Sequence, residues 1–345
     1  MRIEEIVLNE ERNVRLSAWI QDVEGEYGEI TKRPAMLVLP GGGYSMCSDR
    51  EAEPVAAAYT KAGFQTFILR YSVGEHSTWP NPLNDYEQAI TLIRKNTEKW
   101  HVDVNRVGVV GFSAGGHLAA CAATVAENRP NAAILGYAAL TKEICETCQS
   151  GMPYPVDCVD EKTPQCFLFA ARDDSAVNVE NTVKFQQSLI NMGISFESHI
   201  YSFGGHGFST AEAHVSQSFC CGRVKNWVDD SIEWLGEIWG VLTSKGFTQS
   251  VCRRLVNADC CDNLSLDCTI RHLKKQNEEV QMLLKDYYMT IDAVVGAKFQ
   301  NIESAVQIVD GFRLSDVLEM LQTPGEVLMQ LDKALGEITN DKREL

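Results

Sequence analysis

The chain has 345 residues, of which 45% are apolar, so it can bury one large core or two unequal ones, which excludes disorder over most of its length. Its 47 Asp and Glu residues outnumber its 31 Lys and Arg residues, and the formal net charge of -16 argues against nucleic acid or an anionic membrane as a partner. The N-terminal residues lack the pattern of a secretory signal and no long apolar run follows, so we expect a soluble, cytoplasmic protein.

Short apolar segments alternate with longer amphipathic segments from residue 35 to residue 239, which is typical of a mostly parallel central sheet with helices on both faces. An imperfect alternation over residues 14–23 predicts an antiparallel edge strand before the parallel part. The predicted parallel strands cover residues 35–39, 65–69, 107–110, 132–135, 166–170 and 198–201. The predicted helices cover residues 51–62, 83–98, 114–127, 179–192 and 223–239.

Three consecutive glycines follow the first predicted parallel strand, in Pro40-Gly-Gly-Gly-Tyr44. Such a loop exposes backbone N–H groups with no side chain in the way. Its spacing matches neither of the common phosphate-binding glycine motifs, so we do not expect it to bind a nucleotide. The N–H groups of Gly42 and Gly43 are therefore candidates for stabilising a developing oxyanion.

The strongest local signal is Gly111-Phe-Ser-Ala-Gly115, which lies between a predicted strand and a predicted helix. A serine on so sharp a turn needs small residues two positions before and after it. The turn would present the Ser113 hydroxyl above the sheet, and the N–H of Ala114 would face the developing negative charge. Ser113 is thus the candidate nucleophile, while a glycine-rich packing turn is the alternative interpretation of the motif alone.

The twelve cysteines of this chain favour reduced thiols, because disulfide scaffolds belong to short secreted proteins with poor cores. One group, formed by Cys145, Cys148, Cys158 and Cys166, raises the question of a zinc site. Cys166 begins an apolar strand-like run, and the second half of the group lacks the paired spacing of a zinc ribbon. We therefore predict no metal and no other cofactor.

A serine nucleophile needs a base and an acid, and in enzymes with such a turn they follow in the order serine, acid, histidine. His206, in Gly204-Gly-His-Gly207, lies in a glycine-rich loop after the last predicted strand and is the best candidate base. Asp173 and Asp174 follow the preceding strand, and we choose Asp174 because it lies three residues before a valine, leaving Asp173 to shape the turn. His117 is one helical turn past the serine, on a rigid helix, and we interpret it as structural.

The strand and helix alternation stops after Trp239, and residues 264–337 are predicted to form several short helices. Two similar segments, Leu264-Ser-Leu-Asp-Cys-Thr-Ile270 and Phe312-Arg-Leu-Ser-Asp-Val-Leu318, each precede an apolar helical period and indicate two related helical units. We therefore predict a catalytic domain over residues 1–240, a linker over 241–262 and a helical accessory module over 263–345. This module would either pack on the catalytic domain or pair subunits into a homo-oligomer.

Taken together, the spaced motifs resemble those of bacterial carbohydrate esterases of the acetyl-xylan esterase and feruloyl-esterase-like group, within the α/β-hydrolase superfamily. The similarity spans roughly residues 15–239, and it departs at Val177-Asn178, where relatives usually have Val-Pro, and at Pro40, where many esterases have His. The matching stretches are P-G-G-G-Y-S and S-D-R-E-A-E-P between Pro40 and Pro54, I-L-R-Y-S-V, V-G-V-V-G-F-S-A-G-G-H-L-A, and G-G-H-G-F.

This resemblance implies an α/β-hydrolase fold and the hydrolysis of small acyl esters, with acetylated plant-derived oligosaccharides as the expected substrates. Two alternatives remain at this point. A peptidase of the prolyl-oligopeptidase type has the same order of catalytic residues, although only about 30 residues precede the first parallel strand here. A non-catalytic binding protein on the same scaffold is the other alternative, because fold does not dictate function.

Overall fold

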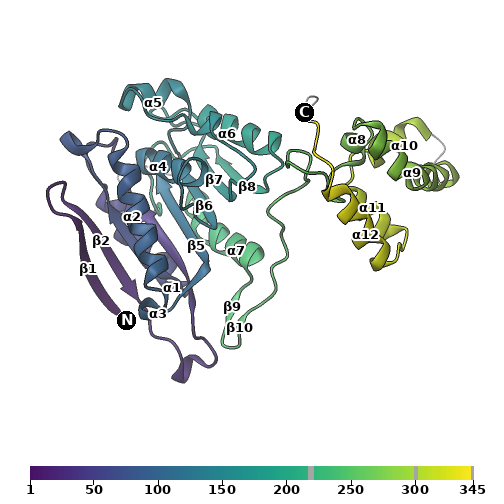
Figure 1. Cartoon of the computed structure of the whole chain (residues 1–345). Helices are drawn as coiled ribbons and strands as arrows, with labels where there is room; N and C mark the ends of the chain where they lie inside the picture. The colour runs from purple at the N-terminus through teal and green to yellow at the C-terminus, as the bar shows by residue number, and fades with distance from the viewer. Residues whose placement is uncertain (217–220, 299–301, 343–345) are drawn as a thin grey trace. The chain divides into compact units, whose positions relative to one another are not determined.

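The computed structural model divides the chain into two compact units (Figure 1). The structure describes residues 1–216, 221–298 and 302–342. The first unit consists of Met1–Leu189 and Ser195–Arg254, and the second consists of Ile190–Ile194 and Leu255–Leu345.

Within the described residues, eight strands form one sheet in the order β1-β2-β4-β3-β5-β6-β7-β8. The pairs β1-β2 and β2-β4 are antiparallel and the other neighbours are parallel, as predicted for a mostly parallel sheet. The strands are β1 (Arg2–Asn9), β2 (Val14–Ile20), β3 (Arg33–Leu39), β4 (Gln65–Arg70), β5 (Val102–Phe112), β6 (Ala132–Gly136), β7 (Gln165–Ala171) and β8 (Phe196–Tyr201).

Helices cover both faces of this sheet, which explains why every residue of β3, β6 and β7 is buried. On one face, α1 and α7 pack their apolar side chains against the central strands, with Tyr59 and Trp227 among the largest fully buried ones. On the other face lie α2 and α4, which also contact each other (Figure 1). The helices of this unit are α1 (Glu53–Lys61), α2 (Asn81–Lys95), α3 (Thr97–Trp100), α4 (Ser113–Thr124), α5 (Lys142–Cys148), α6 (Glu180–Asn191) and α7 (Trp227–Trp239).

The N-terminal edge of the sheet differs from the prediction. Residues 14–20 do form an antiparallel strand, β2, but β2 lies inside the sheet because β1 pairs with its outer side. The sequence of β1 alternates weakly and none of its residues is fully buried, so it carries little of the apolar signal that identifies a strand. The prediction of an edge position for residues 14–23 was therefore wrong.

Part of the predicted linker belongs to the first unit. Residues 242–247 form a short hairpin of β9 (Leu242–Thr243) and β10 (Gly246–Phe247). The Arg106 guanidinium lies 3.8 Å from the centre of the Phe247 ring, and the N–H of Val251 donates to the Glu237 carbonyl over 2.8 Å. These contacts hold residues 241–254 on the first unit. Strands of two residues are too short to show a periodic pattern, so they could not be predicted from the sequence.

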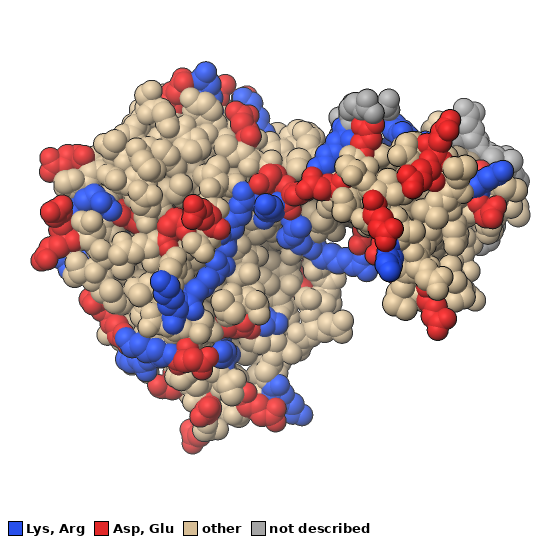
Figure 2. Space-filling view, viewed as in Figure 1, with Lys and Arg blue, Asp and Glu red and all other residues tan. Residues whose placement is uncertain are grey.

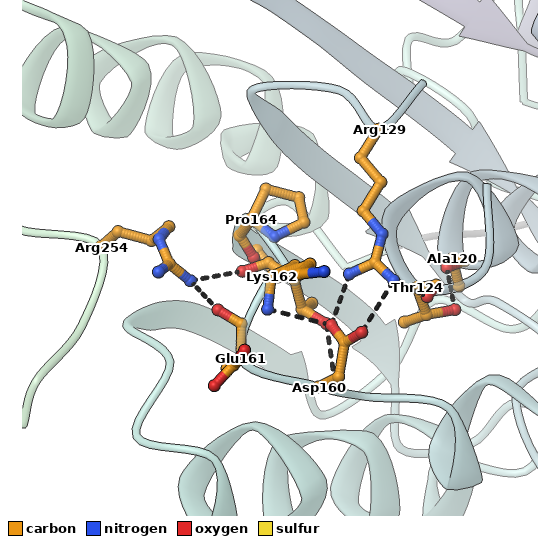
Figure 3. Close-up of polar contacts among 10 residues, drawn as sticks. Ala120, Thr124, Arg129, Asp160, Glu161, Lys162, Pro164 and Arg254 are labelled. Atoms are coloured by element: carbon orange, nitrogen blue, oxygen red, sulfur yellow. Dashed lines mark hydrogen bonds and ion pairs between the residues drawn. The ribbon is translucent and has the colours of Figure 1, made fainter. Parts of the chain in front are cut away.

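The segment between β6 and β7 is irregular apart from α5 and a short 3-10 helix, Pro155–Asp157, and polar contacts fix its end before β7 (Figure 3). Arg129 forms a forked ion pair with the Asp160 carboxylate and also donates to the Thr124 carbonyl at the end of α4. Arg254 donates to the carbonyls of Glu161 and Thr163. Arg129 and Arg254 thus both hold this segment in place.

The second unit is helical and has its own core, in which Leu273, Leu284 and Leu335 are fully buried. Its helices are α8 (Ile270–Leu273), α9 (Glu278–Lys298), α10 (Ile302–Val309), α11 (Leu314–Met320) and α12 (Gly325–Gly336). The two similar segments of the sequence lie side by side, because Ile270 donates to the Phe312 carbonyl and Leu314 to the Cys268 carbonyl. With 21 residues, α9 is longer than the short helices that were predicted.

Charged side chains of both signs are interspersed with uncharged surface on the face drawn in Figure 2. Across residues 1–216, 221–298 and 302–342, we find no helix both long enough and apolar enough to cross a membrane.

Candidate active site

Ser113 lies at the junction of β5 and α4, as the motif around it predicts. Its φ of 52° is in the left-handed region, which costs a non-glycine residue about 1 kcal/mol or more. Both flanking positions need glycine, because the surrounding backbone leaves no room for a Cβ atom there. A Cβ on Gly111 would lie 2.2 Å from the Gly115 carbonyl oxygen, and one on Gly115 would lie 2.2 Å from that of Leu39. The turn therefore holds the serine at the carboxyl end of the sheet.

The structure brings Ser113, His206 and Asp174 together. His206, in the loop after β8, lies with its Nε2 2.9 Å from the Ser113 Oγ. Its Nδ1 is 2.7 Å from Oδ2 of Asp174, in the loop after β7. Since an ionised carboxylate only accepts, Nδ1 carries the ring proton and Nε2 is left to accept from the serine hydroxyl. This is the arrangement that general-base activation of a serine requires.

The two neighbouring aspartates have different partners. The Asp174 side chain is fully buried, and its Oδ1 accepts from the N–H groups of Ala176 and Val177, which orients Oδ2 toward the imidazole. Oδ1 of Asp173 accepts from the N–H groups of Gly204 and Gly205, over 2.9 Å each. The bond from Gly205 contributes most to lowering the pKa of the Asp173 carboxyl, and the bond from Gly204 also lowers it. Asp173 thus shapes the loop that carries His206.

The glycine loop after β3 has the backbone conformation that only glycine adopts readily. Gly42 has φ 129° and Gly43 has φ 60°, and a Cβ on Gly42 would lie 2.2 Å from the Met46 carbonyl oxygen. Among the described residues, the N–H groups of Gly42 and Gly43 donate to no protein acceptor. The N–H of Ala114, in the first turn of α4, has no partner within that helix either. The stabilisation of an oxyanion by these three donors stays a prediction.

Glu51 is the feature of this site that sequence reasoning missed. It follows the glycine loop, is 3% exposed, and accepts from the Gly41 N–H over 2.8 Å and from the Tyr137 hydroxyl over 2.6 Å. Burial raises the pKa of the Glu51 carboxyl, while the bonds from Tyr137 and Gly41 lower it. Charged residues surround it in Ser48-Asp-Arg-Glu-Ala-Glu-Pro54, so the sequence alone did not single out Glu51 as the buried one.

His117 is fully buried, and both of its ring nitrogens form hydrogen bonds with residues other than the serine. Nε2 lies 2.9 Å from the Pro153 carbonyl and must donate to it, so Nδ1 accepts from the Tyr44 hydroxyl over 2.7 Å. Burial lowers the pKa of this imidazole to about 4. His117 therefore connects the glycine loop with the segment between β6 and β7, which fits its interpretation as a structural residue.

The four cysteines considered as a zinc site are free thiols in separate settings. Cys145 is buried and Cys148 is exposed, while Cys166 lies within β7 with its Sγ near the Pro164 carbonyl. In the part of the chain that the structure describes, no three His, Cys, Asp or Glu side chains are grouped as ligands of one metal ion.

Comparison with known proteins finds several similar chains. Residues 22–149 match the family model described as BD-FAE. The chain is 31% identical over 215 residues to endo-1,4-beta-xylanase B of Butyrivibrio fibrisolvens, covering 54% of this chain and 34% of that protein. It is 29% identical over 202 residues to an acetylxylan esterase of Xylanibacter ruminicola, covering 50% of this chain and 41% of that protein. The chain thus spans only about a third to two fifths of these curated relatives.

A solved structure extends the similarity over nearly the whole of a relative. MGS-M1, an alpha/beta hydrolase enzyme from a Medee basin deep-sea metagenome library, is 39% identical, with a TM-score of 0.63. The match covers 68% of this chain and 97% of that protein. The chain therefore belongs to the α/β-hydrolase family.

Proposed function

We propose that this protein is a serine esterase that hydrolyses small acyl esters through Ser113, His206 and Asp174. The observation that carries the proposal is the continuous chain of hydrogen bonds from the serine hydroxyl through the imidazole to a buried carboxylate, 2.9 Å and 2.7 Å long. A serine that only terminated a strand would have no need of a base and an acid contributed by two other loops.

In the proposed reaction, His206 removes the proton of the Ser113 hydroxyl as the oxygen attacks the ester carbonyl. Asp174 stabilises the imidazolium that forms. The N–H groups of Ala114 and of Gly42 or Gly43 stabilise the oxyanion. The imidazolium then protonates the departing alcohol, leaving an acyl-serine. Water, deprotonated by the same imidazole, releases the acid and regenerates the enzyme.

Acetyl groups on plant-derived oligosaccharides are the substrate that we propose. The names of two relatives, a xylanase and an acetylxylan esterase, support a carbohydrate setting. The net charge of -16 fits a neutral ester better than a polyanion. No cofactor enters the proposed reaction, because a triad and backbone donors suffice for ester hydrolysis.

The test combines turnover with active-site labelling. We expect the wild-type protein to hydrolyse p-nitrophenyl acetate and to react with a fluorophosphonate probe, whereas Ser113→Ala should do neither while keeping the same circular dichroism spectrum. Labelling of the Ala variant, or turnover equal to wild type, would refute the nucleophile. A wild-type protein that the probe does not label would instead favour a binding protein on this scaffold.

The substrate class needs a panel. Acetylated xylo-oligosaccharides, feruloyl esters, aryl acetates and a prolyl peptide substrate should be compared by kcat/KM on the same preparation. We expect the acetylated oligosaccharides to be the best substrates and the peptide to be inert. Cleavage of the peptide alone would contradict the esterase proposal.

A further inference from the structure

A buried carboxylate lies behind the glycine loop and has no part in the triad. Glu51, at the end of the 3-10 helix Asp49–Glu51, is 3% exposed. Its Oε2 accepts from the Gly41 N–H over 2.8 Å, and its Oε1 accepts from the Tyr137 hydroxyl over 2.6 Å. Burying a carboxylate costs free energy, so a buried Glu51 indicates a specific role at this place.

The hydrogens available around Glu51 fit its ionised form. The Gly41 N–H can only donate. The Tyr137 oxygen already accepts from the Ser209 N–H over 3.1 Å, so its own single hydrogen is left for Glu51. Both neighbours thus present a proton to the carboxylate, one to each oxygen. A protonated Glu51 would leave one of these hydrogens without an acceptor, which is unfavourable in a buried site.

The same network reaches the loop of the catalytic base. The Tyr137 ring lies 5.0 Å from the His206 ring between centres, edge to face, and 4.7 Å from the ring of Phe208. Arg50, the neighbour of Glu51, donates to the Gly207 carbonyl over 3.1 Å. One buried acid therefore connects the loop of the oxyanion donors with the loop of the base.

We propose that Glu51 is a second carboxylate of the esterase site, which positions the glycine loop and favours the imidazolium form of His206. By engaging the Gly41 N–H, it turns that donor away from the site and fixes the next two peptide groups toward the oxyanion. Tyr137 donates to Glu51 and its ring contacts the imidazole that becomes positive as the serine attacks, so we expect the negative charge of Glu51 to act on that imidazole. This proposal rests on the proposed function, and it treats Glu51 as a positioning residue.

The electrostatic part predicts an effect on the pH profile. Among the residues that the structure describes, Asp174, Asp173, Tyr137 and Arg50 contact His206 or its loop, and Glu51 acts through Tyr137. A nearby anion favours the imidazolium form over the neutral imidazole. Without that anion, the neutral imidazole should persist to lower pH. Loss of the Glu51 charge should therefore move the acid limb of kcat/KM to lower pH while lowering kcat, because the imidazolium of the transition state loses support.

The experiment compares Glu51→Gln with wild type on p-nitrophenyl acetate between pH 4 and 9. Gln keeps the size of the side chain and an acceptor for the Gly41 N–H but removes the charge. We expect kcat to fall by about tenfold or more, with KM within about twofold, and the acid limb to move down by about half a pH unit or more. Glu53→Gln is the matched control, because Glu53 is half-exposed and pairs with Arg70, so the profile should stay as in wild type.

Each outcome decides the proposal. A Gln variant with the kcat and pH profile of wild type would overturn it. A lower kcat with an unmoved acid limb of the pH profile would also overturn it, because Glu51 would then be merely structural. If the Gln variant does not fold, Tyr137→Phe gives the second test, because it removes one donor and keeps the charge. We expect a several-fold loss of kcat, and a wild-type kcat would overturn the positioning role. Failure of the wild-type protein to react with the fluorophosphonate probe would instead identify the proposed function itself as wrong.

Discussion

At the scale of single residues, the pair Asp173 and Asp174 offers a test of the triad. Asp174→Asn should lower kcat on p-nitrophenyl acetate about 10³-fold or more, because an amide in place of the carboxylate no longer supports the imidazolium or its tautomer. Asp173→Asn should cost about tenfold or less, since an amide oxygen can still accept from Gly204 and Gly205. Circular dichroism of both variants controls for folding, and the reverse ranking would exchange the roles of the two residues.

The residues that could be predicted from sequence are those with a fixed place relative to a strand end. Ser113, Asp174 and His206 each follow a predicted strand, so topology alone brings them to one edge of the sheet. Glu51 could not be predicted in this way, because its partners Gly41 and Tyr137 come from other segments. The structure gives Asn178 a local role, because its side chain accepts from the Glu180 N–H at the start of α6.

At the scale of elements, the strands of the sheet interior could be predicted because they are apolar on both faces. The prediction failed where burial is partial. β1 is half-exposed along its length, and α5 is a short helix in which Cys145 is the only buried residue among those described. The spacing of apolar residues reports burial, and such elements are held by neighbours rather than by their own pattern.

The element that depends most on residue size is α4, which begins in the serine turn. A Cβ on Gly115 would lie 2.2 Å and 2.3 Å from the carbonyl oxygens of Leu39 and Pro40, and backbone at the end of β3 cannot move aside cheaply. We expect Gly115→Ala to destabilise the protein by about 1–3 kcal/mol and to abolish turnover, because the turn must shift. Gly222→Ala is the matched control, since no atom of the described residues lies within 4 Å of its added carbon. An equal melting temperature in both variants would show that the turn tolerates a side chain.

At the scale of the whole molecule, the apolar residues form separate cores. The buried cluster of the first unit runs along the sheet from Met36 to Trp239, and that of the second unit runs from Ala258 to Ile338, with no member in common. All residues of the proposed triad lie in the first unit. The helical unit therefore has a core of its own and contributes no residue to the proposed triad.

Leu284→Ala tests whether the cores are energetically independent. Leu284 is fully buried in the second unit, so its truncation should cost that unit about 2–5 kcal/mol. Calorimetry should show one transition at a lower temperature and another unchanged, while kcat on p-nitrophenyl acetate at 25 °C stays at the wild-type value. The control is Met282→Ala on the same helix, whose residue is 74% exposed and whose loss should move neither transition. A single transition that moves as a whole, together with a loss of turnover, would mean that the helical unit supports the catalytic unit, because truncation in one core would then be felt in the other.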